Sequence, residues 1–224
     1  MPTASEAVNA AQRLEIEAAV AAAESKTSCE IVPVVATISG RYDRAEDLVG
    51  LWLATVGAIV VWLILPRDST TGGWSDFPVW GEIIILALSV VVCFVAGAVA
   101  ASRSGTLQRL FTPRRHMSEE ANLRARQLFF DRRVHHTAGA SGILIYVSLH
   151  EHVAVVLGDR TVVECLGESF LEGLCQRLTS DLRLRPVAES LCDVIQHATP
   201  ALEKALPRTE GDANELPDAL VLID

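Results

Sequence analysis

The chain has 224 residues, of which 50% are hydrophobic, and its formal net charge is −9 at pH 7. The acidic balance argues against a nucleic-acid-binding protein, because phosphate contacts need a basic surface. The apolar positions are patterned along the whole chain, which excludes a disordered chain. The five cysteines are odd in number and lack CxxC spacing, which agrees with a reducing compartment.

A helix and a strand are expected first. From Ser5 to Lys26, apolar residues recur at near-helical intervals among charged ones, which predicts an amphipathic helix. Glu30 to Ser39 is rich in β-branched residues and is followed by Gly40, which predicts a strand. Because Pro33 cannot donate a ladder hydrogen bond, we expect an edge position or a bulge there.

Two charge-free apolar runs follow, from Leu48 to Leu65 and from Ile83 to Ser102. At 1.5 Å per residue such helices reach roughly 27 to 30 Å, the thickness of a bilayer's hydrocarbon core. Tryptophans near the run ends and in the intervening loop suit the headgroup level: Trp52, Trp62, Trp74 and Trp80. We therefore predict a transmembrane helical hairpin over 48–102. The alternative is a pair of buried helices in a soluble core.

Basic residues set the expected orientation of this hairpin. The loop 66–82 holds only Arg67, whereas Arg41 and Arg44 precede the first run and four arginines follow the second: Arg103, Arg109, Arg114 and Arg115. By the positive-inside rule, the loop faces outward and both termini are cytoplasmic, as in a two-pass protein of the cell (inner) membrane. These four arginines are candidates for contact with anionic lipid headgroups. The alternative is that they only determine topology.

The apolar runs themselves contain no Asp, Glu, Lys, Arg or His, which argues against a transporter or channel. Small residues recur every fourth position as Gly50, Ala54 and Ala58, and again as Gly97 and Ala101. This spacing favours close helix packing, either within the hairpin or between copies in a homo-oligomer. The alternative is a chance pattern in an alanine-rich chain.

After the hairpin, Ser118 is expected to cap a helix that ends near His135. Two strands, 142–149 and 153–157, are separated by three residues, which predicts a tight β-hairpin. Helices are expected over 167–182 and 186–206, and a last short strand over 218–223.

This order of elements is typical of an α/β layer fold. Neither the helix and strand before the hairpin nor the elements after it would form a well-covered sheet alone. We therefore predict one α/β domain in two parts, 1–47 and 103–224, interrupted by the transmembrane hairpin 48–102.

Three stretches of the chain resemble the TPM domain family (TLP18.3, Psb32 and MOLO-1 type) in its bacterial membrane-protein branch. These are AVAAAESKTSCEIVPVVA at 19–36, SGILIYVSLHEHVAVVLGDR at 141–160, and NELPD at 214–218. The resemblance covers most of both polar segments. It implies a three-layer α/β sandwich and a membrane location. Some members are linked to acid phosphatase activity with calcium, and others to assembly or maintenance of membrane complexes.

The resemblance implies that one residue of this chain corresponds to the family's ligand site. Asp159 matches the acidic residue that closes the second strand of the β-hairpin, and a carboxylate at a strand's carboxyl end suits calcium or magnesium. The chain departs from the family pattern directly afterwards, where Arg160 to Val163 replace acidic and glycine-rich segments. Calcium needs six to eight oxygen ligands, and the sequence shows one carboxylate.

Other reactive residue types give no further site. His150 and His152 straddle Glu151 and could hold zinc or copper, but a solvated turn explains them as well. Three cysteines in apolar stretches are explained as small core residues: Cys165, Cys175 and Cys192. There is no G-x-S-x-G elbow, P-loop or G-x-G-x-x-G turn, so the catalytic residues stay unknown.

The sequence thus predicts a membrane-anchored interaction or assembly module on the cytoplasmic membrane face, with a membrane protein as its partner. The alternative is a divalent-metal-assisted phosphatase acting on phosphomonoesters.

Overall fold

The computed structural model describes residues 3–40, 43–64, 79–104, 110, 112–137, 139–208, 215–216 and 219–224. The chain divides into two compact units. The first comprises 1–40 together with 115–224, and the second comprises 41–114. The first unit is therefore built from two chain segments that the second unit interrupts.

The first unit is α/β. Its strands are β1 (Glu30–Ala36), β2 (Gly142–Ser148), β3 (Val153–Gly158) and β4 (Val221–Ile223). Its helices are α1 (Ala4–Ala7), α2 (Ala10–Glu24), α6 (Arg114–Asp131), α7 (Arg160–Leu166), α8 (Glu168–Asp181) and α9 (Val187–Ala205). The predicted fold class is confirmed.

The four strands form one mixed sheet in the order β3-β2-β1-β4. β1 is parallel to both β2 and β4, so that Val34 lies opposite Tyr146 on one side and Val221 on the other. β3 is antiparallel to β2. The strand that precedes the apolar runs is thus paired on both sides with strands that follow them.

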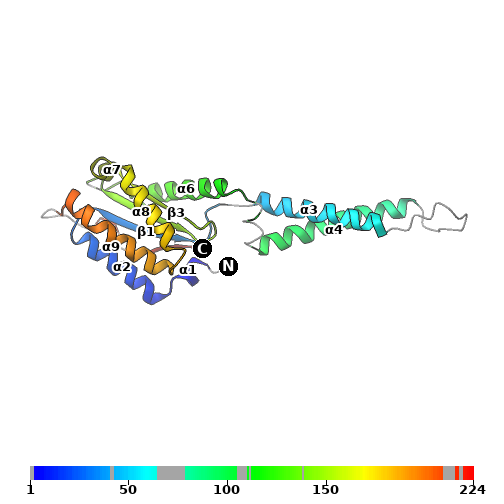
Figure 1. Ribbon diagram of the computed structural model, residues 1–224, viewed down its shortest axis with the longest axis horizontal. Helices are drawn as coiled ribbons and strands as arrows, with labels where there is room; N and C mark the ends of the chain where they lie inside the picture. Colours follow the sequence, from blue (N-terminus) through cyan, green and yellow to red (C-terminus); the bar gives the residue numbers. More distant parts are fainter. Residues whose placement is uncertain are drawn as a thin grey trace, which may run out of the picture. The chain divides into compact units, whose positions relative to one another are not determined.

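Helices cover both faces of this sheet and make three layers (Figure 1). Alternate strand residues point to opposite faces. Ile31 and Val35 of β1 join one hydrophobic cluster with α2, α8 and α9. Val32 and Val34 join the other cluster, with α6. Every residue of β1 and β2 is buried, which explains their nearly continuous apolar sequences.

Pro33 lies in an interior strand of the sheet, but among the described residues β1 has a free side at this position, which is the edge position that was one of the two expected alternatives. Pro33 pairs with Ile145 of β2. On the other side of β1, the ladder with β4 covers only Val34 to Ala36. Pro33 therefore has a strand neighbour on one side only, and its missing N–H falls where the second ladder is absent.

The predicted helix over 5–26 is two helices. α1 begins after Thr3 and α2 after Asn9, and each start carries a complete capping box, with Glu6 and Gln12 as the reciprocal partners. A capping box satisfies two otherwise orphaned backbone N–H groups. The second box starts a new helix inside the stretch that periodicity alone treats as continuous.

The helix after the apolar runs begins at Arg114, four residues before the predicted cap, and ends at Asp131 instead of near His135. Ser118 therefore lies inside α6, where its carbonyl accepts a hydrogen bond from Asn122 Nδ2 at 2.7 Å. The buried face of α6 includes two alanines, Ala121 and Ala125, which allow the helix backbone to approach the sheet closely.

The second unit contains two long apolar helices, α3 (Asp43–Ile64) and α4 (Val79–Arg103). The predicted run 83–102 lies inside α4, and the first run ends one residue beyond α3. Most of the predicted loop 66–82, including Arg67 and Trp74, falls outside the described residues.

Candidate functional site

The two apolar helices are the first functional feature of the chain. Their apolar stretches, Glu46–Ile64 and Trp80–Arg103, are long and apolar enough to span a membrane, and only 17% and 6% of the respective windows are buried. Trp52, Trp62 and Trp80 are all more than half exposed. A helix in the core of a soluble protein would be mostly buried.

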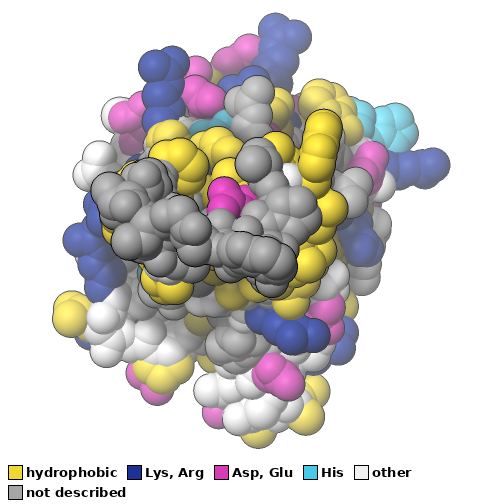
Figure 2. Space-filling model, turned by 90° about the vertical axis from the view of Figure 1, so that its right-hand side faces the viewer, with side chains coloured by type: hydrophobic (Ala, Val, Ile, Leu, Met, Phe, Trp, Pro, Cys, Tyr) yellow, Lys and Arg dark blue, Asp and Glu magenta, His cyan; other side chains and the backbone are white. Residues whose placement is uncertain are grey.

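Small residues form the contact between α3 and α4. Gly50, Ala54, Gly97 and Ala101 are buried, and a Cβ at Gly97 would lie 2.9 Å from the Cα of Gly50. The predicted close packing within the hairpin is therefore present, and it leaves the large apolar side chains on the outer surface. Hydrophobic side chains gather on the surface turned to the viewer in Figure 2.

Three of the four predicted membrane-surface arginines fall on described residues. Arg103 ends α4, while Arg114 and Arg115 open α6. Arg109 lies outside the described residues. The Arg115 side chain is 91% exposed although its Nε lies 2.9 Å from Glu119 Oε1, so it remains accessible to a further anion.

Asp159 is the N-cap of α7. Its side chain accepts a hydrogen bond from the backbone N–H of Arg160 at 2.7 Å. Because β3 is antiparallel to β2, Asp159 lies beside the amino end of β2, and its own N–H donates to Gly142 O at 2.8 Å. The ligand-binding edge of an open parallel sheet is the opposite one, so the edge argument used for this residue does not apply.

No group of three or more His, Cys, Asp or Glu side chains that could hold a metal ion occurs among the residues that the structure describes. His150 is 4% exposed and Glu151 6%, so the turn between β2 and β3 is buried there and not solvated as the sequence suggests. His152 is exposed and has a positive φ of 54°. The two histidines therefore do not share one face of a strand.

The carboxyl ends of β1 and β2 instead carry a polar cluster that the sequence analysis missed. Its members are Ser39, Tyr146, Ser148 and Glu151. Glu151 Oε1 accepts from the backbone N–H groups of Ser39 at 2.8 Å and Gly40 at 3.4 Å, and its other oxygen accepts from the Ser148 hydroxyl. The hydroxyls of Ser39 and Tyr146 are 2.8 Å apart. No signal in the sequence indicates this cluster, because its members come from two segments that meet only in the folded sheet.

Burial raises the pKa of the Tyr146 phenol above its ordinary value of 10; the hydrogen bond with Ser39 lowers the pKa by less than burial raises it, and the carboxylate of Glu151 adds a smaller raising effect. The phenol therefore stays protonated at neutral pH. This cluster uses its donors and acceptors internally and holds the segment 39–40 against the sheet.

A second buried carboxylate links two stretches of the resemblance. Glu30, from TSCEIV, accepts hydrogen bonds from the backbone N–H groups of Glu215 at 3.2 Å and Leu216 at 3.3 Å, both in NELPD. Leu216 also packs against the cluster on the α6 face of the sheet. Asn214 and the last two residues of the motif lie outside the described residues.

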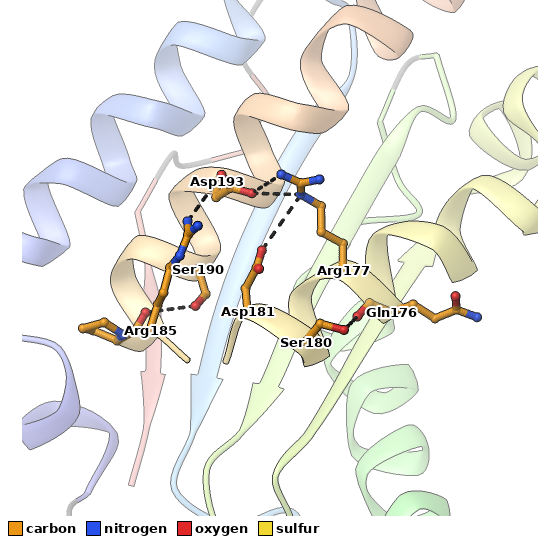
Figure 3. A network of polar contacts seen from close by, with 8 residues as sticks. Gln176, Arg177, Ser180, Asp181, Arg185, Ser190 and Asp193 are labelled. Atoms are coloured by element: carbon orange, nitrogen blue, oxygen red, sulfur yellow. Dashed lines mark hydrogen bonds and ion pairs between the residues drawn. The ribbon is translucent and has the colours of Figure 1, made fainter. Parts of the chain in front are cut away.

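Charged side chains join α8 to α9 on the surface. Asp193 Oδ2 of α9 lies 2.9 Å from Nε and 2.8 Å from Nη2 of Arg177 on α8, and its Oδ1 lies 3.8 Å from Arg185 Nη1 (Figure 3). Arg177 also lies 3.9 Å from Asp181. Because these side chains are partly exposed, the network contributes little to stability; it links α8 to α9 and is not a reactive site.

The cysteines are not uniformly core residues. Burial raises the pKa of the Cys175 thiol, and Cys29 is buried, but Cys165 is exposed. The prediction that Cys165 is a core residue was wrong, because it lies on the outer side of the short helix α7, which the sequence analysis did not predict.

Comparison with known proteins shows the fold alone. No family model matches the chain, and no curated protein matches it. Among solved structures, the BA42 protein from the psychrophilic bacterium Bizionia argentinensis is similar, with a TM-score of 0.55 and 16% identity over 96% of this chain and 94% of that one. The two proteins share an α/β fold.

Proposed function

We propose that the chain is a TPM-domain protein of the cell membrane, anchored by α3 and α4 with both termini in the cytoplasm. Its α/β unit acts there as an interaction or assembly module for a membrane protein partner. The observation that carries this proposal is the exposed apolar surface of the two helices.

Exposure of this apolar surface to water would be energetically unfavourable. Fully burying one Val, Leu, Ile or Phe side chain stabilises by roughly 1.5 to 3 kcal/mol, and many such side chains of α3 and α4 are exposed, among them Leu63, Ile64 and Leu88. A lipid bilayer covers them without any further protein. This supports the hairpin over the alternative of two core helices in a soluble protein.

The family assignment rests on how the resembling stretches meet. EIVPVVA and GILIYVS are neighbouring strands in register from Glu30 opposite Gly142 to Ala36 opposite Ser148. The NELPD stretch is held to the first of them through Glu30. The order and the contacts of these stretches support a TPM-type domain.

The module is favoured over the phosphatase because three carboxylates of the α/β unit bind backbone N–H groups, although Oδ2 of Asp159 is buried without a hydrogen-bond partner among the described residues. Asp159 caps α7, and Glu151 and Glu30 bind backbone N–H groups. A calcium or magnesium site at Asp159 needs further oxygen ligands, and the described residues near it offer no cluster of acidic side chains.

Membrane topology is tested with single cysteines at two exposed leucines, Leu14 of α2 and Leu184 after α8. Each variant is made in a chain in which the exposed Cys165 and the partly exposed Cys93, Cys175 and Cys192 are replaced by serine or alanine, and it is labelled with an impermeant maleimide in cells and in inverted vesicles. We expect both sites to react only from the cytoplasmic face. Labelling of the two sites from opposite faces contradicts a single sheet built from both segments.

Activity is tested with the purified chain in detergent on a generic phosphomonoester with calcium or magnesium. Asp159→Asn is the informative variant, because asparagine is an equally good N-cap and removes only the charge. Turnover that is lost in this variant favours the phosphatase. Absence of turnover, together with a defined membrane protein crosslinked to the α/β unit in native membranes, favours the module.

A further inference from the structure

We infer that the outer side of α6 is a docking surface for the anionic headgroups of the cytoplasmic leaflet, so that the α/β unit lies on the membrane and does not hang free from it. This inference rests on the proposed membrane location. It concerns five exposed residues, called here the outer α6 stripe: Arg115, Glu119, Leu123, Arg126 and Phe130.

The stripe follows helical geometry. Its members are three or four positions apart, so they lie along one side of the helix. The opposite side of α6 is the one packed on the sheet, through residues that include Ala121, Ala125 and Leu128. The stripe is therefore not needed for the fold.

Two large apolar side chains on the stripe face outward. Leu123 is 56% exposed and Phe130 61%, and the Phe130 ring lies 4.9 Å from the ring of His135. Among the described residues of the α/β unit, the exposed large apolar side chains are Leu14, Ile38, Leu123, Phe130 and Leu184. Two of these five lie on one side of one helix, where they share the surface with Arg115 and Arg126.

Charge complements this apolar content. From 114 to 133, exposed arginines outnumber exposed carboxylates, with Arg114, Arg115, Arg126, Arg132 and Arg133 against Glu119 and Asp131. This is a local reversal in a chain of net charge −9. Arg115 and Arg126 also line a shallow open depression, in which they outnumber its one carboxylate, Glu119; the other lining residues are Ser118, Asn122 and Leu123. Guanidinium groups bind phosphate through paired hydrogen bonds.

Both chain connections that lead to the hairpin leave the α/β unit beside α6. Residues 104–113, between α4 and α6, span at most roughly 35 Å. The other connection leaves the α/β unit at Gly40, where a Cβ would lie 2.9 Å from Glu120 Cγ of α6. Both connections therefore leave the unit beside the amino-terminal half of α6.

The test uses the full chain in nanodiscs with and without anionic lipid. A fluorophore is attached to Phe130→Cys in a chain in which Cys93, Cys165, Cys175 and Cys192 are replaced by serine or alanine, and its quenching by lipids that carry a spin label near the headgroup is measured. Leu14→Cys on α2, which packs on the other face of the sheet, is the matched control. We expect strong quenching at 130 with anionic lipid, less with zwitterionic lipid, and little at 14 in either.

The arginines are tested in the same assay. Replacing Arg115 and Arg126 by glutamine should shift the docking equilibrium by roughly 25-fold, at about five-fold for each arginine. The control pair is Arg13→Gln with Arg160→Gln, which removes the same charge from two other helices. It breaks two i,i+4 ion pairs, whereas the test pair breaks the one between Arg115 and Glu119. The control should leave the quenching unchanged.

Equal quenching at 130 and 14, or quenching at 130 that does not depend on anionic lipid, overturns the docking surface. Extraction by alkaline carbonate separates this result from failure of the proposed function. A chain that stays in the carbonate-washed membrane but shows no quenching at 130 is anchored without docking, whereas a chain that is extracted is not anchored at all.

Discussion

The backbone N–H of Ser39 donates to the carboxylate of Glu151 at 2.8 Å, across 112 positions of sequence that include both apolar helices. This bond fixes the last residues of the amino-terminal segment to the turn that closes the β2–β3 hairpin. It also places a buried carboxylate where the chain leaves the sheet toward α3.

Glu151→Ala is expected to destabilise the α/β unit by about 1 to 3 kcal/mol, because buried donors that lose their acceptor pay the desolvation cost of an unmade hydrogen bond. The donors are the N–H groups of Ser39 and Gly40 and the hydroxyl of Ser148. Thermal unfolding of the purified chain measures the loss. Glu151→Gln keeps an acceptor oxygen and should lose less; an alanine variant as stable as the parent contradicts the anchoring role.

Tyr146 gives a prediction on pH. Its folded pKa is raised above the ordinary value of 10, first by burial, so its contribution to stability is complete below pH 10 and is lost as the pH rises toward the folded pKa. In Tyr146→Phe this part of the alkaline loss is absent.

The measurement is the free energy of unfolding between pH 8 and 11, taken as the difference between the parent and Tyr146→Phe. Near pH 8 the parent should be more stable by about 1 kcal/mol, for the lost bond to Ser39. Toward pH 11 the difference should shrink. A difference that stays constant over this range shows that the phenol does not titrate as its burial requires.

A structural feature of this protein can be predicted from the sequence when the residues that determine it are close together in the chain. Apolar run length predicts α3 and α4 because it is read within twenty residues, and the buried strands are visible as β-branched runs. That the strands before and after the hairpin share one sheet can be inferred because neither segment has enough elements to form a covered sheet alone.

The polar cluster could not be predicted, because Ser39 and Glu151 meet only once the sheet has formed, and nothing in their separate surroundings indicates the contact. The break between α1 and α2 was readable, since Thr3 with Glu6 and Asn9 with Gln12 have the spacing of capping boxes. The role of Asp159 was readable too, as an N-cap before a short apolar segment.

Glu30→Ala is expected to release the segment 215–216 from β1, because it removes the acceptor for the N–H groups of Glu215 and Leu216. Amide hydrogen exchange in the peptide that contains these residues should speed up, with a loss of stability of about 1 to 3 kcal/mol. Glu203→Ala is the matched control, because Glu203 is exposed on α9 and should change neither quantity. Unchanged exchange in Glu30→Ala shows that the segment is held by Leu216 packing alone.

The contact between α3 and α4 predicts that one substitution destabilises the hairpin and that a second substitution restores its stability. A Cβ at Gly57 would lie 2.4 Å from Cys93 Sγ, whereas one at Gly97 would meet the backbone of Gly50 at 2.9 Å. Gly57→Ala should therefore destabilise the hairpin by about 1 to 3 kcal/mol through overpacking, and Cys93→Ala in the same chain should restore most of the loss. Gly97→Ala should not be restored by Cys93→Ala, because its obstacle is backbone. Double-mutant cycles on thermal unfolding in detergent measure the coupling of Cys93→Ala to Gly57→Ala and to Gly97→Ala. Equal coupling energies for the two pairs would contradict this geometry.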